Sequence, residues 1–363
     1  MKKFNLMLIL VALLVSNPIT TKAQTNPNTH AIKLAHKLIK QKHFAGTITL
    51  VKNGQIIAQI SNGYQNYQTK VKNTATTPYM IGSVSKAITA QLIALLAQNK
   101  KLALTDRLAT YYPNLPGASE VTLAELLNHR SGLDTSYFSL HKHYDSYQTY
   151  LTALVHQAKI DPQNINSWHY SSYNYNLLAG IITQVSGQSY ATFLKQAITT
   201  PLGIHLDLMQ ATALKSYSYL GGSFFSQTDY NPYNAYGAGQ IAMNGRDLYY
   251  LLAAFLQSKL LTPSLTATLY HKPPTAAFPY YSAGFYHLQS GVYHLHGTQL
   301  GDETSVTISP DGQQAVLVQS NVTAYTKGGV YGRAAPELCG EEPDRTETEK
   351  ERELIRTWKG TVP

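Results

Sequence analysis

A serine and a lysine stand three residues apart, at Ser83 and Lys86, just after a glycine and just before a long apolar run. Residues at this spacing share one face of a helix, so the lysine amine can reach the serine hydroxyl. A buried lysine is desolvated, which favours its neutral form and allows it to act as a base. The positive end of the helix also favours negative charge that develops nearby. This turn therefore predicts a nucleophilic serine together with the base that activates it.

A structural role for Ser83 is the alternative, because serine is a favoured residue at the N-cap of a helix. The S-x-x-K spacing is weak by itself, since Ser139 and Lys142 also fit it. That second pair lies among polar and aromatic residues and is not followed by a buried helix. The first pair leads into apolar residues that recur at helical spacing up to Asn99. We therefore take the first pair as the reactive one.

The elements that hold this turn can be predicted from the chain on both sides of it. Residues 44–61 predict two strands around an Asn53-Gly54 turn. The middle of the chain, from about residue 102 to 275, is mostly helical and rich in loops. Strands return after residue 280, and the last two are joined across Asp311-Gly312. Strands at both ends with helices between them predict one sheet built from both chain ends, with an inserted helical subdomain.

Residues 1–23 have the layout of a secretory signal, with Lys2 and Lys3 before a short apolar run that ends in small residues. We expect export, with retention by an uncleaved signal as the alternative. The single cysteine, Cys339, excludes an intramolecular disulfide framework. The net charge of +9 comes from scattered lysines, which favours attraction to polyanions at a cell surface over nucleic-acid binding.

The last 31 residues differ in composition from the rest of the chain. They hold four of its seven arginines and eight of its 20 acidic residues. We therefore divide the chain into a signal peptide (1–23), a catalytic domain (24–332) and an atypical charged tail (333–363).

The serine segment resembles the S-x-x-K box of the serine β-lactamase and penicillin-binding protein superfamily. It is most similar to the class C-like branch, which includes D,D-peptidases and D-alanyl esterases. Three further segments, at residues 123–133, 185–204 and 238–252, resemble ordered segments of that branch, and the likeness extends from about Ala45 to Asn321. The resemblance implies an α/β (α+β) fold with a β-lactamase/transpeptidase-like antiparallel sheet, and an acyl-enzyme formed on Ser83.

The branch places a tyrosine motif, Y-x-N, opposite the serine, and the sequence WHYSSYNYNLLAG puts Tyr170 in the tyrosine place. A phenol near Lys86 can relay the proton of Ser83 to the leaving group. Tyr173 and Tyr175 are the competing tyrosines, for which side-chain packing is the alternative role.

Ser172 stands where that motif has asparagine. A short hydroxyl cannot both donate and accept at the reach of a carboxamide. The resemblance gives this position a role in substrate binding, so the exchange favours esters over peptides and β-lactams.

The third motif of the family, K-T-G or H-x-G, borders the site on a strand. His296-Gly297-Thr298 is the candidate, with threonine where glycine is usual, and His294 offers a competing register. The resemblance implies that this triplet positions substrate. It also implies an oxyanion hole made by the backbone amides of the nucleophile and of a residue near Gln299.

Two competing interpretations stay open. The sequence HKHYD, residues 141–145, has an H-x-H-x-D spacing seen in zinc-dependent hydrolases, although two histidines in a polar loop are usually solvated. The degenerate second and third motifs are also typical of a catalytically weak module that binds or senses penicillin.

We predict an exported serine hydrolase of the cell envelope that needs no metal and no other cofactor. D-alanyl esters of teichoic acid are the expected substrate, because an ester has a better leaving group than an amide and needs less amide-specific binding. A D-Ala-D-Ala carboxypeptidase acting on peptidoglycan peptides and a β-lactamase are the alternatives. No nucleic-acid partner is expected.

Overall fold

The computed structural model of the protein describes residues 27–40, 44–136, 144–208, 217–220, 223–226, 232–272, 280–288 and 290–322. The predicted signal, the second S-x-x-K pair, His141 and His143 of the H-x-H-x-D sequence, and the charged tail with Cys339 all lie outside these residues.

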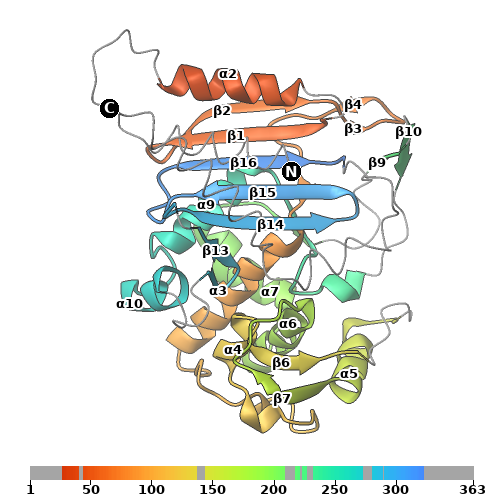
Figure 1. Cartoon of the computed structure of the whole chain (residues 1–363), viewed down its shortest axis with the longest axis vertical. Coiled ribbons are helices and arrows are strands. Elements are labelled where there is room, and N and C mark those ends of the chain that lie inside the picture. Colours follow the sequence, from red (N-terminus) through yellow and green to blue (C-terminus); the bar gives the residue numbers. More distant parts are fainter. Residues whose placement is uncertain are drawn as a thin grey trace.

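One antiparallel sheet of seven strands dominates the molecule (Figure 1), in the order β12-β13-β14-β15-β16-β1-β2. Strand β1, from the first part of the chain, pairs directly with β16, from its last part, since Gly46 lies opposite Ser320 and Val51 lies opposite Ala315. The predicted antiparallel sheet built from both chain ends is thus confirmed. The strands are β1 (Gly46–Lys52), β2 (Gln55–Asn62), β12 (Tyr281–Ser282), β13 (Phe285–His287), β14 (Tyr293–Gln299), β15 (Asp302–Ile308) and β16 (Ala315–Ser320).

The predicted hairpin turn joins β1 to β2. Asn53 and Gly54 have φ values of 52° and 74°, and two successive residues with positive φ characterise the turns that fit the twist of a two-residue hairpin. Strands β15 and β16 are joined across Asp311-Gly312, also as predicted.

Successive residues of a strand point to opposite faces of the sheet, and here both faces carry apolar residues that helices cover. On the outer face, Ile48 and Leu50 of β1 pack with Ala31 and Ala35 of α2 (Pro27–Ile39). On the inner face, α9 (Gly245–Leu256) begins so close to β1 that a Cβ on Gly245 would lie 2.4 Å from Thr49 Oγ1.

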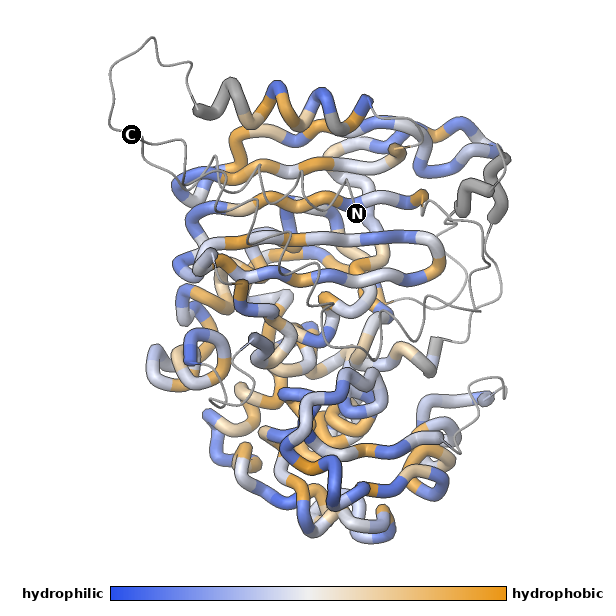
Figure 2. Tube along the Cα trace, viewed as in Figure 1, coloured by the Kyte–Doolittle hydropathy of each residue, from blue (hydrophilic) through white to orange (hydrophobic). Residues whose placement is uncertain are grey.

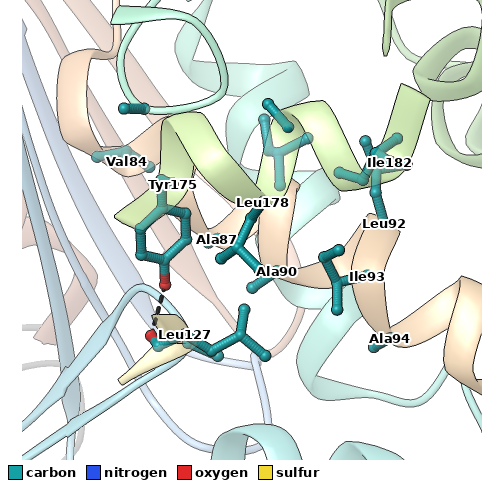
Figure 3. Packing of buried hydrophobic residues seen from close by; sticks show 14 of the residues in the cluster. Val84, Ala87, Ala90, Leu92, Ile93, Ala94, Leu127, Tyr175, Leu178 and Ile182 are labelled. Atoms are coloured by element: carbon teal, nitrogen blue, oxygen red, sulfur yellow. Dashed lines mark hydrogen bonds between the residues drawn. The ribbon is translucent and has the colours of Figure 1, made fainter. Parts of the chain in front are cut away.

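Helix α3 (Ser85–Gln98) runs from the inner face of the sheet into the helical part of the molecule (Figure 1). All of its residues from Ser85 to Leu96 are buried, which confirms the expectation of a helix covered nearly all round. Its alanines allow α6 (Ser172–Ser186) to approach closely, and Leu178 and Ile182 pack against this face (Figure 3). The two helices bring residues from distant parts of the chain to one place.

The helical part also contains shorter elements. Its remaining helices are α4 (Leu123–Leu127), α5 (Tyr147–Gln157), α7 (Tyr190–Leu194), α8 (Thr200–Leu202) and α10 (Pro263–Thr266). Its small sheets, and those beside the main sheet, pair β3 (Tyr64–Asn66) with β4 (Val71–Lys72), β6 (Ser131–Asp134) with β7 (Lys159–Ile165), β9 (Tyr217–Leu220) with β10 (Ser223–Ser226), and β11 (Ile241–Met243) with both β5 (Tyr79–Met80) and β8 (Asp207–Leu208). The 3₁₀ turns are η1 (Gly82–Val84), η2 (Leu108–Thr110), η3 (Ala118–Glu120) and η5 (Pro232–Ala235), and the π-helical turns are η4 (Lys195–Thr199) and η6 (Ala267–His271).

Apolar residues recur along the strands and on the helices beneath the sheet, and hydrophilic residues gather at the turns (Figure 2). One large apolar cluster joins the inner face of the sheet to α3, α6 and α9, and a smaller one lies under α2. In the part of the chain that the structure describes, no helix has the length and apolar character to cross a membrane.

Candidate active site

Ser83 lies in the serine turn, by which we mean residues 79–84, which comprise strand β5 and the turn η1 directly before helix α3. Gly82 has a φ of 49° and opens the 3₁₀ turn that contains the serine. Helix α3 begins after it, with Val84 in the cap position and no side chain capping the helix. Ser83 is therefore not the helix cap, which removes the structural alternative.

The main sheet holds the serine turn from one side. The Met80 amide donates to Asp302 Oδ2 at 2.8 Å, and the Thr304 hydroxyl donates to the Met80 carbonyl at 3.2 Å. The Ile81 amide donates to the Ile241 carbonyl at 2.9 Å. Asp302 is only 2% exposed, so its carboxylate serves the fold of this turn. No local motif in the sequence marks Asp302, because its carboxylate acts across 222 positions of the chain.

Lys86 is 1% exposed, and its amine contacts three separate elements. Its Nζ lies 2.9 Å from Ser83 Oγ, 3.2 Å from Ser172 Oγ and 3.1 Å from the Ala238 carbonyl oxygen. A charged ammonium would donate to all three atoms, whereas a neutral amine would donate to two and accept from the Ser83 hydroxyl. The predicted contact between Ser83 and Lys86 is present, and the geometry allows the neutral amine to take the serine proton.

Two of the three candidate tyrosines face this amine. Lys86 Nζ lies 4.9 Å from the ring centroid of Tyr170 and 5.8 Å from that of Tyr175. Tyr175 is fully buried, burial raises its pKa, and it donates its proton to the Leu127 carbonyl at 2.7 Å (Figure 3). Burial also raises the pKa of Tyr173, to about 12. Tyr170 is half-buried, so it is the tyrosine of this group that can meet both the lysine and a substrate.

Tyr170 is supported by His129, which lies in the family-like segment at residues 123–133 but was given no role from the sequence. The ring centroids of His129 and Tyr170 lie 4.3 Å apart. The Ser171 amide donates to His129 Nδ1 at 3.2 Å, so Nδ1 carries no proton, and Nε2 donates to the Tyr281 hydroxyl at 3.1 Å. Burial, and then the charge of Lys86, hold the pKa of His129 well below its usual value. A neutral His129 therefore fixes the loop that carries the tyrosine.

Strand β14 meets the serine turn at Gly297. A Cβ on Gly297 would lie 2.1 Å from the Ile81 carbonyl oxygen and 2.4 Å from the Ser83 nitrogen, and a Cβ on Gly82 would lie 2.5 Å from the Thr298 nitrogen. Real Cβ atoms do not come this close to backbone, so both glycines are required. The backbones of the strand and the serine turn are thus in direct contact.

This contact corrects the expected register of the third motif. We expected the triplet His296-Gly297-Thr298, with Thr298 in the place of glycine, but the close approach is made by Gly297 itself. Side chains alternate along a strand, so His296 and His294 point to the outer face. There His296 Nε2 lies 3.1 Å from Glu303 Oε1, and the two histidine rings stack 6.4 Å apart. The structure thus places the His296 side chain on the opposite face of the strand from Ser83.

Gln299 returns to the inner face. Gly239 lies between this side chain and the serine turn. A Cβ built on Gly239 would lie 3.3 Å from Gln299 Oε1 and 3.6 Å from the carbonyl carbon of Gly82. Of the predicted substrate-binding residues, Ser172, Gly297 and Gln299 lie beside the serine turn. Thr298 contributes its backbone there, and its exposed side chain lies on the face of His296.

Metal binding was an alternative function. Within the described ranges, no three His, Cys, Asp or Glu residues are grouped so that they could hold a metal ion. The zinc hypothesis rested on His141 and His143, which lie outside the described ranges. It therefore stays untested.

Comparison with known proteins places this geometry in context. A family model described as Beta-lactamase matches residues 31–336 of the chain. PbpX of Bacillus subtilis, named as a candidate penicillin-binding protein, is 28% identical over 314 residues, which are 84% of this chain and 77% of PbpX. The teichoic acid D-alanine hydrolase of Staphylococcus aureus (strain MRSA252) is 30% identical over 298 residues, which are 80% of this chain and 74% of that protein.

A solved structure has the same architecture. The crystal structure of FmtA from Staphylococcus aureus superimposes with a TM-score of 0.73 and 25% sequence identity. The match covers 88% of this chain and 91% of FmtA. The two chains thus share their fold over most of their length.

The contact at Gly297 predicts that even one methyl group there strongly reduces activity. Gly297→Ala should lower kcat/KM by roughly 10²-fold or more, because the methyl group pushes the strand away from the backbone that binds a developing oxyanion. Gly291→Ala is the control: no atom of the described residues lies within 4 Å of a Cβ there, so its positive φ of 83° costs stability without a contact that could displace the strand. Ester hydrolysis should be compared after circular dichroism has shown both variants to be folded. Full activity of Gly297→Ala would contradict the close contact.

The buried histidines predict a fall in stability on mild acidification. Burial, and secondarily a neighbouring positive group, lowers the pKa of His129 well below its usual value, that of His287 to about 4 and that of His294 to about 3. Below pH 6.5 the unfolded chain takes up protons that the folded chain cannot, so the free energy of unfolding should decrease by up to about 1.4 kcal/mol per pH unit for each histidine.

Urea unfolding at pH 7.0 and pH 5.5 measures this effect. His129→Asn should reduce the pH dependence, and His205→Asn, whose parent side chain is 81% exposed, serves as the control. An unfolding free energy that stays constant or rises between pH 7.0 and pH 5.5 would show that these histidines are not held neutral.

Proposed function

The chain belongs to the Beta-lactamase family, within the serine β-lactamase and penicillin-binding protein superfamily, and we propose that this hydrolase is exported and removes D-alanine from esters of a cell-envelope polymer. Ser83 forms the acyl-enzyme in this proposal. The observation that carries it is the 2.9 Å distance between Lys86 Nζ and Ser83 Oγ inside a buried site.

Acylation begins when Ser83 Oγ attacks the ester carbonyl carbon and gives its proton to the Lys86–Tyr170 pair. The new oxyanion is held by the backbone amides of Ser83 and Thr298, which lie on the two sides of the Gly82–Gly297 contact. The bond to the leaving oxygen then breaks, and that oxygen receives a proton. Water attacks the D-alanyl enzyme in the second half of the reaction, with the same groups acting in reverse order.

Three observations support an ester of an anionic polymer as the substrate. The relative at 30% identity is named as a teichoic acid D-alanine hydrolase. The chain carries a formal net charge of +9, which attracts polyanions. Ser172 occupies the place of the family asparagine and contacts Lys86, so the carboxamide that would bind a peptide-like acyl group is absent from that place. Residues 1–23 support the proposed export by their signal-like composition.

Penicillin binding is the second candidate function, favoured by the 28% identity to PbpX. A site of this kind can acylate on a β-lactam or on a D-Ala-D-Ala peptide with the same nucleophile. Because amides have poorer leaving groups and need more substrate contacts, we expect these reactions to be slower than ester hydrolysis.

Release of free D-alanine tests the proposal. Purified protein should release D-alanine from D-alanylated lipoteichoic acid faster than from a D-Ala-D-Ala peptide, and Ser83→Ala should lower the rate on the order of 10³-fold or more. Ser85→Ala is the matched control, because this neighbouring hydroxyl is fully buried and has no hydrogen-bond partner among the described residues, so its removal should leave activity intact.

Each contrary result has a defined meaning. Release from the peptide alone would replace the esterase by a carboxypeptidase. Release from neither substrate, together with stable labelling by a fluorescent penicillin, would indicate a sensing module. Full activity of Ser83→Ala would remove the nucleophile assignment itself.

A further inference from the structure

The Lys86 amine lies between two serine hydroxyls. Its Nζ is 2.9 Å from Ser83 Oγ and 3.2 Å from Ser172 Oγ. Ser172 is the first residue of α6 and is half-buried, whereas Lys86 is buried. A path of hydroxyl, amine and hydroxyl therefore crosses the site.

Counting donors and acceptors gives this path a direction. The Ala238 carbonyl can only accept, so it takes one N–H of Lys86 at 3.1 Å. Once the amine has taken the Ser83 proton, its remaining N–H groups face the two serine oxygens. Ser83 is by then bonded to the acyl carbon, which leaves Ser172 as the hydroxyl in this set that can accept a proton and pass on its own.

The aromatic rings stabilise the protonated amine between these two transfers. Lys86 Nζ lies within 6 Å of the ring centroids of both Tyr170 and Tyr175. A cation at this distance from an aromatic ring is attracted to the negative face of the ring. The two rings thus stabilise the ammonium form of Lys86 before it gives up its proton.

Serine differs from asparagine in what it can do at this place. A hydroxyl can accept one proton while it releases another, but a neutral carboxamide has no proton that it can exchange in this way at ordinary pH. The substitution that removes a substrate-binding amide therefore adds a group able to act as a general acid.

We propose that Ser172 is a catalytic residue that delivers the proton from Lys86 to the leaving oxygen of the substrate, an inference that rests on the proposed acyl-enzyme mechanism. The Ser83 Oγ–C bond forms and the C–O bond of the ester breaks. The proton of Ser83 moves to Lys86, a proton moves from Lys86 to Ser172 Oγ, and the original Ser172 proton moves to the departing alkoxide. The products are the acyl-enzyme and a neutral alcohol, and Ser172 and Lys86 end as they began.

This route matters most for unactivated alkyl esters, such as the ester of a polyol. An alkoxide is a strong base and must be protonated as it leaves, whereas a 4-nitrophenolate is stable without a proton. A proton-donating Ser172 thus predicts that its loss affects the two leaving groups unequally, which loss of packing would not do.

The experiment compares the ethyl and 4-nitrophenyl esters of one acyl group by kcat/KM, which reports the steps up to acylation. Ser172→Ala should lose about 10²-fold or more on the ethyl ester, in the range of general acid catalysis, and less than about 10-fold on the nitrophenyl ester. Ser172→Thr keeps the hydroxyl and should keep both activities within about 10-fold. Ser186→Ala is the matched control on the same helix, about 21 Å away along its axis, and should change neither.

Equal losses of Ser172→Ala on both esters would overturn the proposal and assign Ser172 to the support of Lys86. The proposal is also overturned if Tyr170→Phe shows the unequal loss and Ser172→Ala does not, because the phenol would then be the donor. Failure of the proposed function is distinguishable, since it appears as full activity of Ser83→Ala. A wild-type protein that hydrolyses neither ester would overturn both.

Discussion

The burial of one lysine amine constrains the whole site. A buried charge or amine is costly unless its hydrogen bonds are made, and Lys86 at 1% exposure has partners at Ser83, Ser172 and the Ala238 carbonyl. These partners come from the serine turn, the start of α6 and the loop before β11. The loop is held in turn by Thr89, which donates to the Gly237 carbonyl at 2.5 Å. Three distant segments must therefore fold together before the lysine can be buried.

The sheet supplies the second constraint. Because both chain ends enter one sheet, β14 and β15 can be placed against a turn that lies more than 200 residues earlier. Gly297 and Gly82 allow the two backbones to touch, and Asp302 and Thr304 fix the Met80 peptide beside them. In the mechanism we propose, the amine activates the serine from the helical side, and the strand binds the oxyanion from the sheet side. The ester hydrolysis that we propose depends on this placement of one serine between two layers.

Local patterns in the sequence were enough to predict the elements and part of the site. The Asn53-Gly54 turn, the buried helix after Ser83 and the two-ended sheet each follow from a short-range rule on φ, helical periodicity or strand pattern. The roles that were missed act over long range. His129 and Ala238 lie in segments that resemble the family, but the role of His129, like that of Asp302, is defined by partners far away in the chain. The Ala238 carbonyl belongs to the backbone and has no residue-type signal. The sequence also could not predict which residue of the third motif, His296 or Gly297, faces Ser83. That is decided by the packing of β14 on the serine turn.

The central claim is that Ser83 carries the acyl group of the substrate. Rapid acid quenching of the protein during turnover of a D-alanyl ester, followed by proteolysis and mass spectrometry of the peptides, tests this directly. We expect a peptide that contains Ser83 and has gained the mass of one D-alanyl group, and no such peptide from Ser83→Ala. Turnover without any adduct under conditions in which deacylation limits the rate, or an adduct on a different serine, would contradict it.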